Sequence, residues 1–154
     1  MKLEDALKSD AVLPLAKRTA LNFMITDTML SQKFLDFFKQ YDISAQQFNV
    51  LRILRGQKGK PANLATIQER MIHKNSNTTR LIDKLIKKEF VKRSVCPDNR
   101  RKIEIIITQH GLELLNTIDP KLNDLEESII QPLTTTEAET LNILLEKLRG
   151  SQSA

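Results

Sequence analysis

The chain has 154 residues, of which 40% are hydrophobic and 28% are charged. This length suits one domain over residues 1–154, and the composition excludes wholesale disorder and fibrous repeats. No apolar run approaches the roughly 20 residues of a membrane span, and the N-terminus lacks the apolar core of a signal peptide, so we expect a cytoplasmic protein. The single cysteine, Cys96, and the two histidines exclude a disulfide framework and predict neither a metal site nor a cofactor.

The net charge of +5 is unevenly distributed along the chain. Residues 1–40 carry 6 basic and 5 acidic side chains, residues 41–108 carry 15 and 6, and residues 109–154 carry 3 and 8. A basic middle segment between a neutral and an acidic one is typical of a lobe that binds a polyanion such as nucleic acid. From charge alone, an ordinary solvated basic surface is an equal alternative.

A long helix is the first predicted element. After Pro14, apolar side chains recur at spacings of three, four and seven, which indicates a helix over 15–40. A helix of this length rises about 1.5 Å per residue and extends beyond a compact lobe, so a partner chain is expected to cover part of it. Ser44 then predicts the N-cap of a second helix, which ends at Gly56.

A helix-turn-helix is predicted next. Asn63 caps a short helix, and a turn near 72–74 leads to a second helix over 75–89. On this second helix, 100° per residue gathers apolar side chains on one face and leaves polar and basic ones opposite. The lysines of this helix face only two acids, Asp83 and Glu89. This excess of positive charge favours a surface that contacts the phosphates and bases of nucleic acid, rather than an ordinary amphipathic surface helix.

Two β-branched stretches, 91–95 and 103–107, predict a hairpin joined by residues 96–102. Its connection contains three consecutive cations, Arg100, Arg101 and Lys102. Burying three adjacent charges is very costly, so this tip is solvated or meets an anion. A helix-turn-helix followed by a basic hairpin is a winged helix, which suits one helix in the major groove and an arginine near the neighbouring minor groove.

Two helices complete the predicted order. Thr108 predicts the N-cap of a helix over 109–131, which Pro120 is expected to kink or interrupt. Thr134 and Glu137 have the spacing of a capping box, and leucines follow at helical spacing in the last helix. The fold class is therefore mainly α with a small β-hairpin wing (α+β).

Four short segments, taken in this order, resemble the MarR family, the multiple-antibiotic-resistance type of winged-helix transcriptional regulators. They are SNTTRLIDKL at 76–85, FVKR at 90–93, DNRR at 98–101, and Ile107-Thr108 followed by Gly111. The resemblance runs from about Leu21 to Leu148 and so covers nearly the whole chain.

The resemblance implies a triangular homodimer in which the N- and C-terminal helices interlock. It divides the chain into a winged helix-turn-helix DNA-binding lobe at 43–108 and dimerisation helices at 15–40 and 109–150. Two-fold symmetry then implies a pseudo-palindromic operator with recognition helices roughly 34 Å apart.

Short polar side chains at the start of the recognition helix can reach base edges; their other role is helix capping, expected of Asn75 or Ser76. Arg80 suits a guanine edge or a phosphate, and a salt bridge to Asp83 at i+3 is the competing explanation. Thr79 is expected to turn partly toward the core. The predicted DNA-binding residues are Asn75, Ser76, Asn77, Thr79, Arg80, Lys84, Lys87, Arg100, Arg101 and Lys102.

Two arginines compete for the groove contact of the wing. The family's wing usually reads Asp-x-Arg at a fixed distance before the next helix, and counting back from Thr108 gives Arg101 this role. The literal match is instead Asp98 with Arg100. We favour Arg101 in the minor groove, with Arg100 and Lys102 on phosphates.

The predicted function is a sequence-specific transcriptional regulator, which the resemblance makes a repressor. Its predicted partners are double-stranded DNA, a second copy of the chain and a small-molecule effector of unknown identity. The alternative is a winged-helix protein interaction module that has lost DNA binding, against which the basic helix face and hairpin argue. We expect no enzyme, since the sequence has no Gly-rich phosphate loop, Ser/His/Asp set or metal cluster. Some relatives sense oxidants through a cysteine in the N-terminal helical region; Cys96 lies beside the wing and is expected to be structural or incidental.

Overall fold

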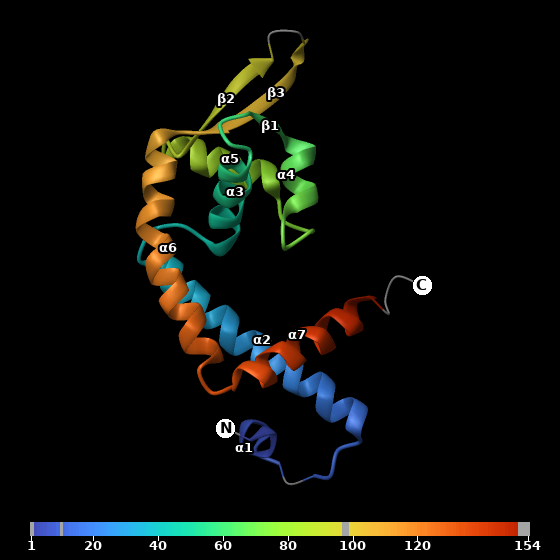
Figure 1. Cartoon of the computed structure of the whole chain (residues 1–154). Helices are drawn as coiled ribbons and strands as arrows, with labels where there is room; N and C mark the ends of the chain where they lie inside the picture. The colour runs from blue at the N-terminus through green and yellow to red at the C-terminus, as the bar shows by residue number, and fades with distance from the viewer. Residues whose placement is uncertain (1, 10, 97–98, 151–154) are drawn as a thin grey trace. The chain divides into compact units, whose positions relative to one another are not determined.

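The computed structural model describes residues 2–9, 11–96 and 99–150; for residues 96 and 99–102 it describes the backbone alone. The chain forms two compact units, residues 1–108 and 109–154. Figure 1 shows the elements of each unit in chain order. None of the described helices is long and apolar enough to cross a membrane.

The first unit begins with a short helix, α1 (Leu3–Leu7), that the sequence analysis missed, and the predicted long helix, α2 (Leu15–Lys39). The α2 prediction is confirmed, and Pro14 occupies its N-cap position. Leu3 is buried, and an ion pair of 3.2 Å joins Glu4 to Arg18 of α2. Most of α2 is exposed, and Phe38 near its C-terminal end is its one buried residue.

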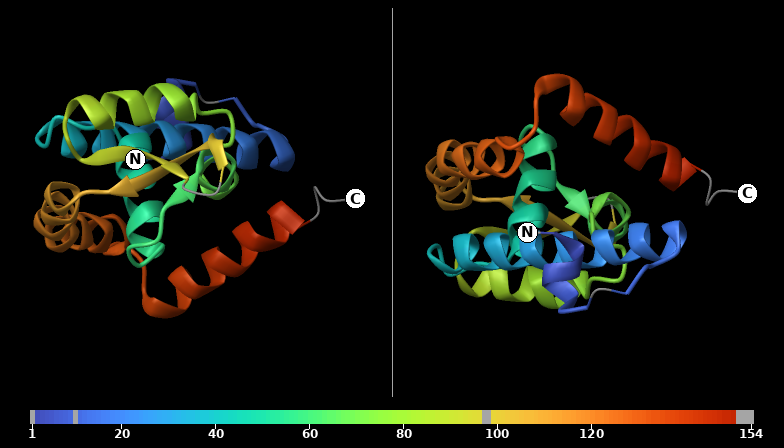
Figure 2. Two further views of the ribbon diagram at one scale, coloured as in Figure 1. Left: turned by 90° about the horizontal axis from the view of Figure 1, so that it is seen from above. Right: turned by 90° about the horizontal axis from the view of Figure 1, so that it is seen from below.

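The centre of this unit is α3 (Ala45–Gly56), whose N-cap is confirmed. Ser44 Oγ accepts from the backbone N–H of Gln47, and Gln47 Oε1 accepts from the N–H of Ser44, which completes a capping box. Val50, Leu51 and Leu54 of α3 are almost fully buried. Both views of Figure 2 show α3 passing close to the sheet, and it contacts β3 and α5.

The helix-turn-helix consists of α4 (Leu64–Arg70) and α5 (Thr78–Lys87). Asn63 caps α4 as predicted, its Oδ1 accepting from the N–H of Thr66 at 2.8 Å. The predicted start of the second helix at residue 75 is wrong by three residues, because the backbone still turns there and Ser76 accepts from the N–H of Thr78. Asn77, and not Asn75 or Ser76, is the N-cap, its Oδ1 accepting from the N–H of Arg80.

A small antiparallel sheet completes the unit, in the order β1-β3-β2. The hairpin of β2 (Val91–Cys96) and β3 (Asn99–Ile107) is confirmed, although its strands extend further toward the tip than predicted. The third strand, β1 (Ala62–Asn63), was not predicted; Ala62 pairs with Ile105 of β3. The strands β2 and β3 form the wing that projects beyond α3 and α4 (Figure 1).

The second unit contains α6 (Gln109–Ile130) and α7 (Thr135–Gly150). The helix α6 continues through Pro120, so the expected interruption is wrong, and the alternative, a kink at this residue, stays a prediction. The predicted capping box of α7 is confirmed: the backbone N–H of Thr134, and also its hydroxyl, donate to Glu137 and lower the pKa of this carboxyl. The hydrogen bonds from Thr134 favour the charged carboxylate of Glu137 and so stabilise the folded chain. This stabilisation is fully present above the ordinary pKa of a glutamate carboxyl and is lost as the pH falls through the lowered pKa.

The C-terminal end of α5 is closed by a Schellman motif. The N–H of Phe90 donates to the carbonyl of Leu85, and the N–H of Glu89 donates to that of Ile86. Glu89 has a φ of 61°, in the left-handed region where a side chain clashes with the backbone and glycine does not.

Glu89→Gly is therefore expected to stabilise the protein. Removing the clash at this position stabilises the folded state by about 1 kcal/mol, and the greater flexibility of glycine in the unfolded chain offsets part of this gain. Urea unfolding at fixed protein concentration measures the difference. The matched control is Glu89→Ala, which removes the same charge and keeps the left-handed strain. Equal stability of the two variants would contradict a strained backbone at this position.

Candidate nucleic-acid interface

The turn before α5 is held in place by side chains from α3 and α4. Asn49 of α3 accepts from the N–H of Ile72 at 2.9 Å. Gln68 of α4 donates to the carbonyl of Lys74 at 2.5 Å and accepts from the hydroxyl of Thr78, which is buried at the start of α5. One amide thus holds both the middle of the turn and the first residue of α5, so the first turn of α5 has a defined position relative to α4.

The predicted site residues near the start of α5 lie in two groups. Asn75, Ser76 and Asn77 belong to the turn and to the N-cap, where they precede the helix. Thr79 and Arg80 lie in its first turn and are exposed, so the expected partial burial of Thr79 is wrong. Six residues from 75 to 80 therefore present a mostly polar, solvent-accessible edge, interrupted by the buried Thr78.

The outer face of α5 is basic along its length. Its inner face is confirmed, since Thr78, Ile82 and Leu85 are buried. The predicted cations Arg80, Lys84 and Lys87 are all exposed. Three positive side chains on ten residues, with Asp83 as the single acid of the helix, give α5 the electrostatic character that phosphate contacts require.

Asp83 is paired with the wing and not with Arg80. Arg93 Nη2 of β2 lies 2.5 Å from Asp83 Oδ1, and both side chains are about half exposed. The predicted competing salt bridge within α5 is therefore replaced by one that joins the recognition helix to the wing. This ion pair neutralises the acid on the outer face and leaves the guanidinium of Arg80 available to an external partner.

The three cations of the wing lie at a break in the β-ladder. Val91 to Val95 pair in regular register with Ile107 to Ile103, and the next pair is Cys96 with Asn99. Residues 100–102 of β3 consequently have no counterpart in β2. The register therefore shifts between Val95 and Cys96, and an irregularity of this kind, like a β-bulge, bends a strand. The side chains of Arg100, Arg101 and Lys102 are outside the described part, as are Asp98 and the side chain of Cys96, so the choice between the two arginines stays a prediction.

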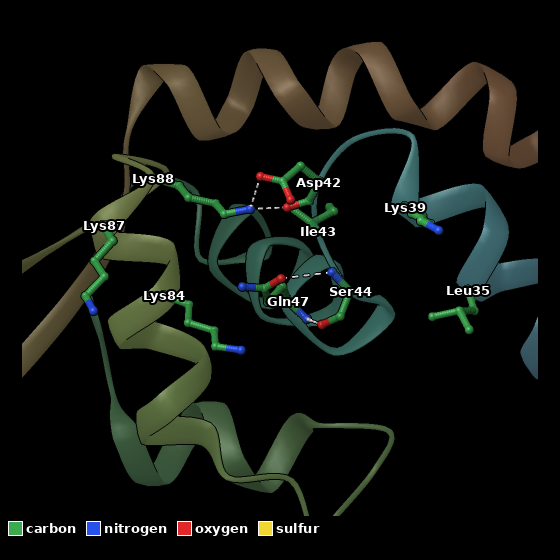
Figure 3. Close-up of a pocket in the computed structure, with 9 residues that line it drawn as sticks. All are labelled: Leu35, Lys39, Asp42, Ile43, Ser44, Gln47, Lys84, Lys87 and Lys88. Atoms are coloured by element: carbon green, nitrogen blue, oxygen red, sulfur yellow. Dashed lines mark hydrogen bonds and ion pairs between the residues drawn. The ribbon is translucent and has the colours of Figure 1, made fainter.

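A cavity of about 490 Å³ lies beside α5 within the first unit. Figure 3 shows Lys84 of α5 and Lys88, the C-cap residue of this helix, extending toward α3 and the connection before it. Lys88 donates to the backbone carbonyl of Asp42, and its Nζ lies 2.5 Å from Asp42 Oδ2. The other lining residues are Leu35, Lys39, Ile43, Ser44, Gln47 and Lys87. The cavity therefore combines apolar side chains with four ammonium groups.

Sequence reasoning missed the residues that position the site. Arg93, Gln68 and Asp42 were not singled out, because each acts through a partner 10 or more residues away. A signal for Arg93 was present in its place on the hairpin next to the helix that carries Asp83. Where the structure describes the side chains, no three His, Cys, Asp or Glu residues come together as a metal site.

The fold and the exposed basic face define a winged helix-turn-helix protein, and comparison with known proteins agrees. The MarR family model matches residues 43–103. The transcriptional regulator SarZ of Staphylococcus epidermidis is 25% identical over 130 residues, 84% of each chain. The chain therefore resembles the MarR family across residues 43–103, and it is similar to a known transcriptional regulator over most of its length.

Solved structures share this fold. A MarR transcription factor from Planctomyces limnophilus is 29% identical, with a TM-score of 0.69 over 88% of this chain and 98% of that one. A variant of MarR from E. coli complexed with operator DNA is 22% identical, with a TM-score of 0.72 over 82% of this chain and 89% of that one.

Proposed function

We propose that this protein is a sequence-specific DNA-binding regulator, not an enzyme, that places α5 in the major groove and its wing near the adjacent minor groove. The observation that carries the proposal is the exposed basic face of α5, joined to the wing by the Asp83–Arg93 ion pair. Arginine and lysine on such a face suit guanine edges and phosphates. The fold shared with a MarR variant bound to operator DNA supports the same docking.

The contacts divide by chemistry. The turn and first turn of α5 suit base edges, its later lysines suit phosphates, and the wing suits the minor groove, where arginine is favoured by the negative potential. The proposed contact residues are Asn75, Ser76, Asn77, Thr79, Arg80, Lys84, Lys87, Arg100, Arg101 and Lys102. In this scheme residues 43–108 form the DNA-binding lobe.

We further propose that the protein is a homodimer and a repressor, as its resemblance to the MarR family implies. Both proposed dimerisation regions carry exposed apolar side chains that water solvates poorly. On α2 these include Phe23, Met24 and Met29, and on α7, which buries no residue, they include Leu141, Ile143 and Leu144. Analytical ultracentrifugation is expected to give twice the mass of one chain, and a monomer at micromolar concentration would contradict the dimer.

An effector is proposed to bind the cavity beside α5. Its ammonium groups and the apolar Leu35 and Ile43 suit a small organic anion. Lys84 and Lys87 line this cavity and also belong to the proposed phosphate-binding face. An anion bound here would compete with DNA for the same charges, which supplies a route from ligand binding to release of the operator.

The function is tested by binding the purified protein to the DNA upstream of its own gene and to unrelated DNA at several salt concentrations. A regulator is expected to protect a near-palindromic site and to bind it about 10³-fold or more tightly than unrelated DNA. Weak binding that is equal for both DNAs and abolished by modest salt would contradict a specific regulator at this site and leave only a basic surface.

A further inference from the structure

Two apolar side chains of the wing are exposed directly opposite each other. Val95 of β2 pairs with Ile103 of β3, and these side chains are 60% and 52% exposed. They form the last regular pair before the break at residues 100–102. Two large β-branched side chains side by side on a solvent-exposed hairpin form a small apolar surface, the wing pair, for which packing within the described unit supplies no cover.

The wing pair lies on the inner face of the hairpin. Side chains of a strand alternate between faces, so Val91, Arg93 and Val95 share one face with Ile107, Ile105 and Ile103 opposite them. On this face Val91, Ile105 and Ile107 are buried in the core, and Arg93 reaches Asp83 of α5. The wing pair lies two residues further toward the tip of the hairpin, roughly 6.6 Å beyond Arg93 at about 3.3 Å per residue.

On this geometry we propose, as an extension of the proposed DNA binding, that the wing pair packs against deoxyribose. If α5 occupies the major groove and the wing the adjacent minor groove, the DNA strand that separates the grooves passes between them. The inner face of the wing just beyond the Asp83–Arg93 contact then lies against that strand. Its sugars offer an apolar surface, and residues 100–102, which directly precede Ile103 on β3, carry cations that suit the neighbouring phosphates.

The chemistry favours DNA over a protein partner at this place. A protein interface depletes charge at its apolar centre, whereas the wing pair has three consecutive cations immediately beside it in the chain. An apolar patch within a cationic hairpin matches a backbone of alternating sugars and phosphates. The contact carries no base information, so it strengthens binding to every duplex that the wing can enter.

The test is the double variant Val95→Thr with Ile103→Thr. Threonine keeps the β-branched shape that suits a strand, so the hairpin is retained, and thermal unfolding checks this. We expect affinity for the operator to fall by on the order of tenfold because apolar burial is lost. The slope of log K against log salt should stay within about 0.5 of the unchanged protein, since an apolar contact releases no counterions. Hydroxyl-radical cleavage, which attacks deoxyribose, should lose protection at a few sugars of each half-site.

The control is Ser94→Ala, which trims the outer face of the same hairpin and should leave affinity and footprint unchanged. Unchanged affinity of the double variant would overturn the proposal. A flatter salt dependence of binding would also overturn the proposal, because the lost affinity would then come from contacts between the cations and the phosphates. Retained affinity with a changed oligomeric state would assign the wing pair to contact between copies of the chain. If the unchanged protein binds no duplex, the proposed DNA binding itself is wrong. This result differs from the one that overturns the wing-pair contact alone, in which the unchanged protein and the double variant bind equally well.

Discussion

Arg80→Ala is expected to weaken operator binding by about 1–3 kcal/mol and to relax specificity at one base position. Arg80 is exposed in the first turn of α5, and its backbone N–H is fixed by the cap of Asn77. The nearest acid in the helix, Asp83, is engaged by Arg93, so the guanidinium of Arg80 does not lose a native partner when it meets DNA. Titration of the operator, of single-base variants and of unrelated duplex measures both effects.

Lys87→Ala is the matched control, because Lys87 is exposed two turns later on the same helix. A phosphate contact carries no direct base information, so this variant should weaken binding to all duplexes about equally and reduce the salt slope by about 0.9. An Arg80 variant that behaves in the same way would place Arg80 on a phosphate. Unchanged binding by the Arg80 variant would remove it from the interface.

The helices were predictable where the chain marks their ends with its own side chains. Ser44, Asn63 and Thr134 each cap the helix that follows, and each interaction spans three residues, so the pattern is visible in the sequence. The buried face of α5 was predictable for a similar reason, because helical geometry alone decides which of its side chains face the core.

Elements that depend on distant partners were not predictable. The strand β1 has two residues and exists because β3 offers it a free edge. The start of α5 moved from residue 75 to Thr78 because Gln68 binds the turn and the hydroxyl of Thr78. Local propensity favoured an earlier start, and a tertiary hydrogen bond decided otherwise.

The ion pairs of the site also depend on distant partners and were not predictable from the sequence. The sequence spacing allows an ion pair between Arg80 and Asp83 at i+3. In the structure Asp83 pairs instead with Arg93, which lies on another element. This changes the expected chemistry of the helix: an internal pair would have occupied the guanidinium of Arg80, whereas the observed pair leaves it available. Arg80 therefore stays a proposed DNA contact, with a guanidinium that does not have to leave Asp83 to reach a base or a phosphate.

Arg101→Ala is expected to weaken operator binding by about 1–3 kcal/mol, with the largest loss where the flanking sequence has a narrow minor groove. The backbone supports this choice, because Arg101 is the middle of the three residues of β3 that lack a partner in β2. Arg101 has an unpaired residue on each side, whereas Arg100 and Lys102 each lie next to a paired residue. The comparison is with Arg100→Ala, which should cost less and act equally on A-tract and mixed flanks. If Arg100→Ala instead removes the preference for a narrow groove, the wing is inserted in the other register. Equal, sequence-independent losses for both variants would confine the wing to phosphates.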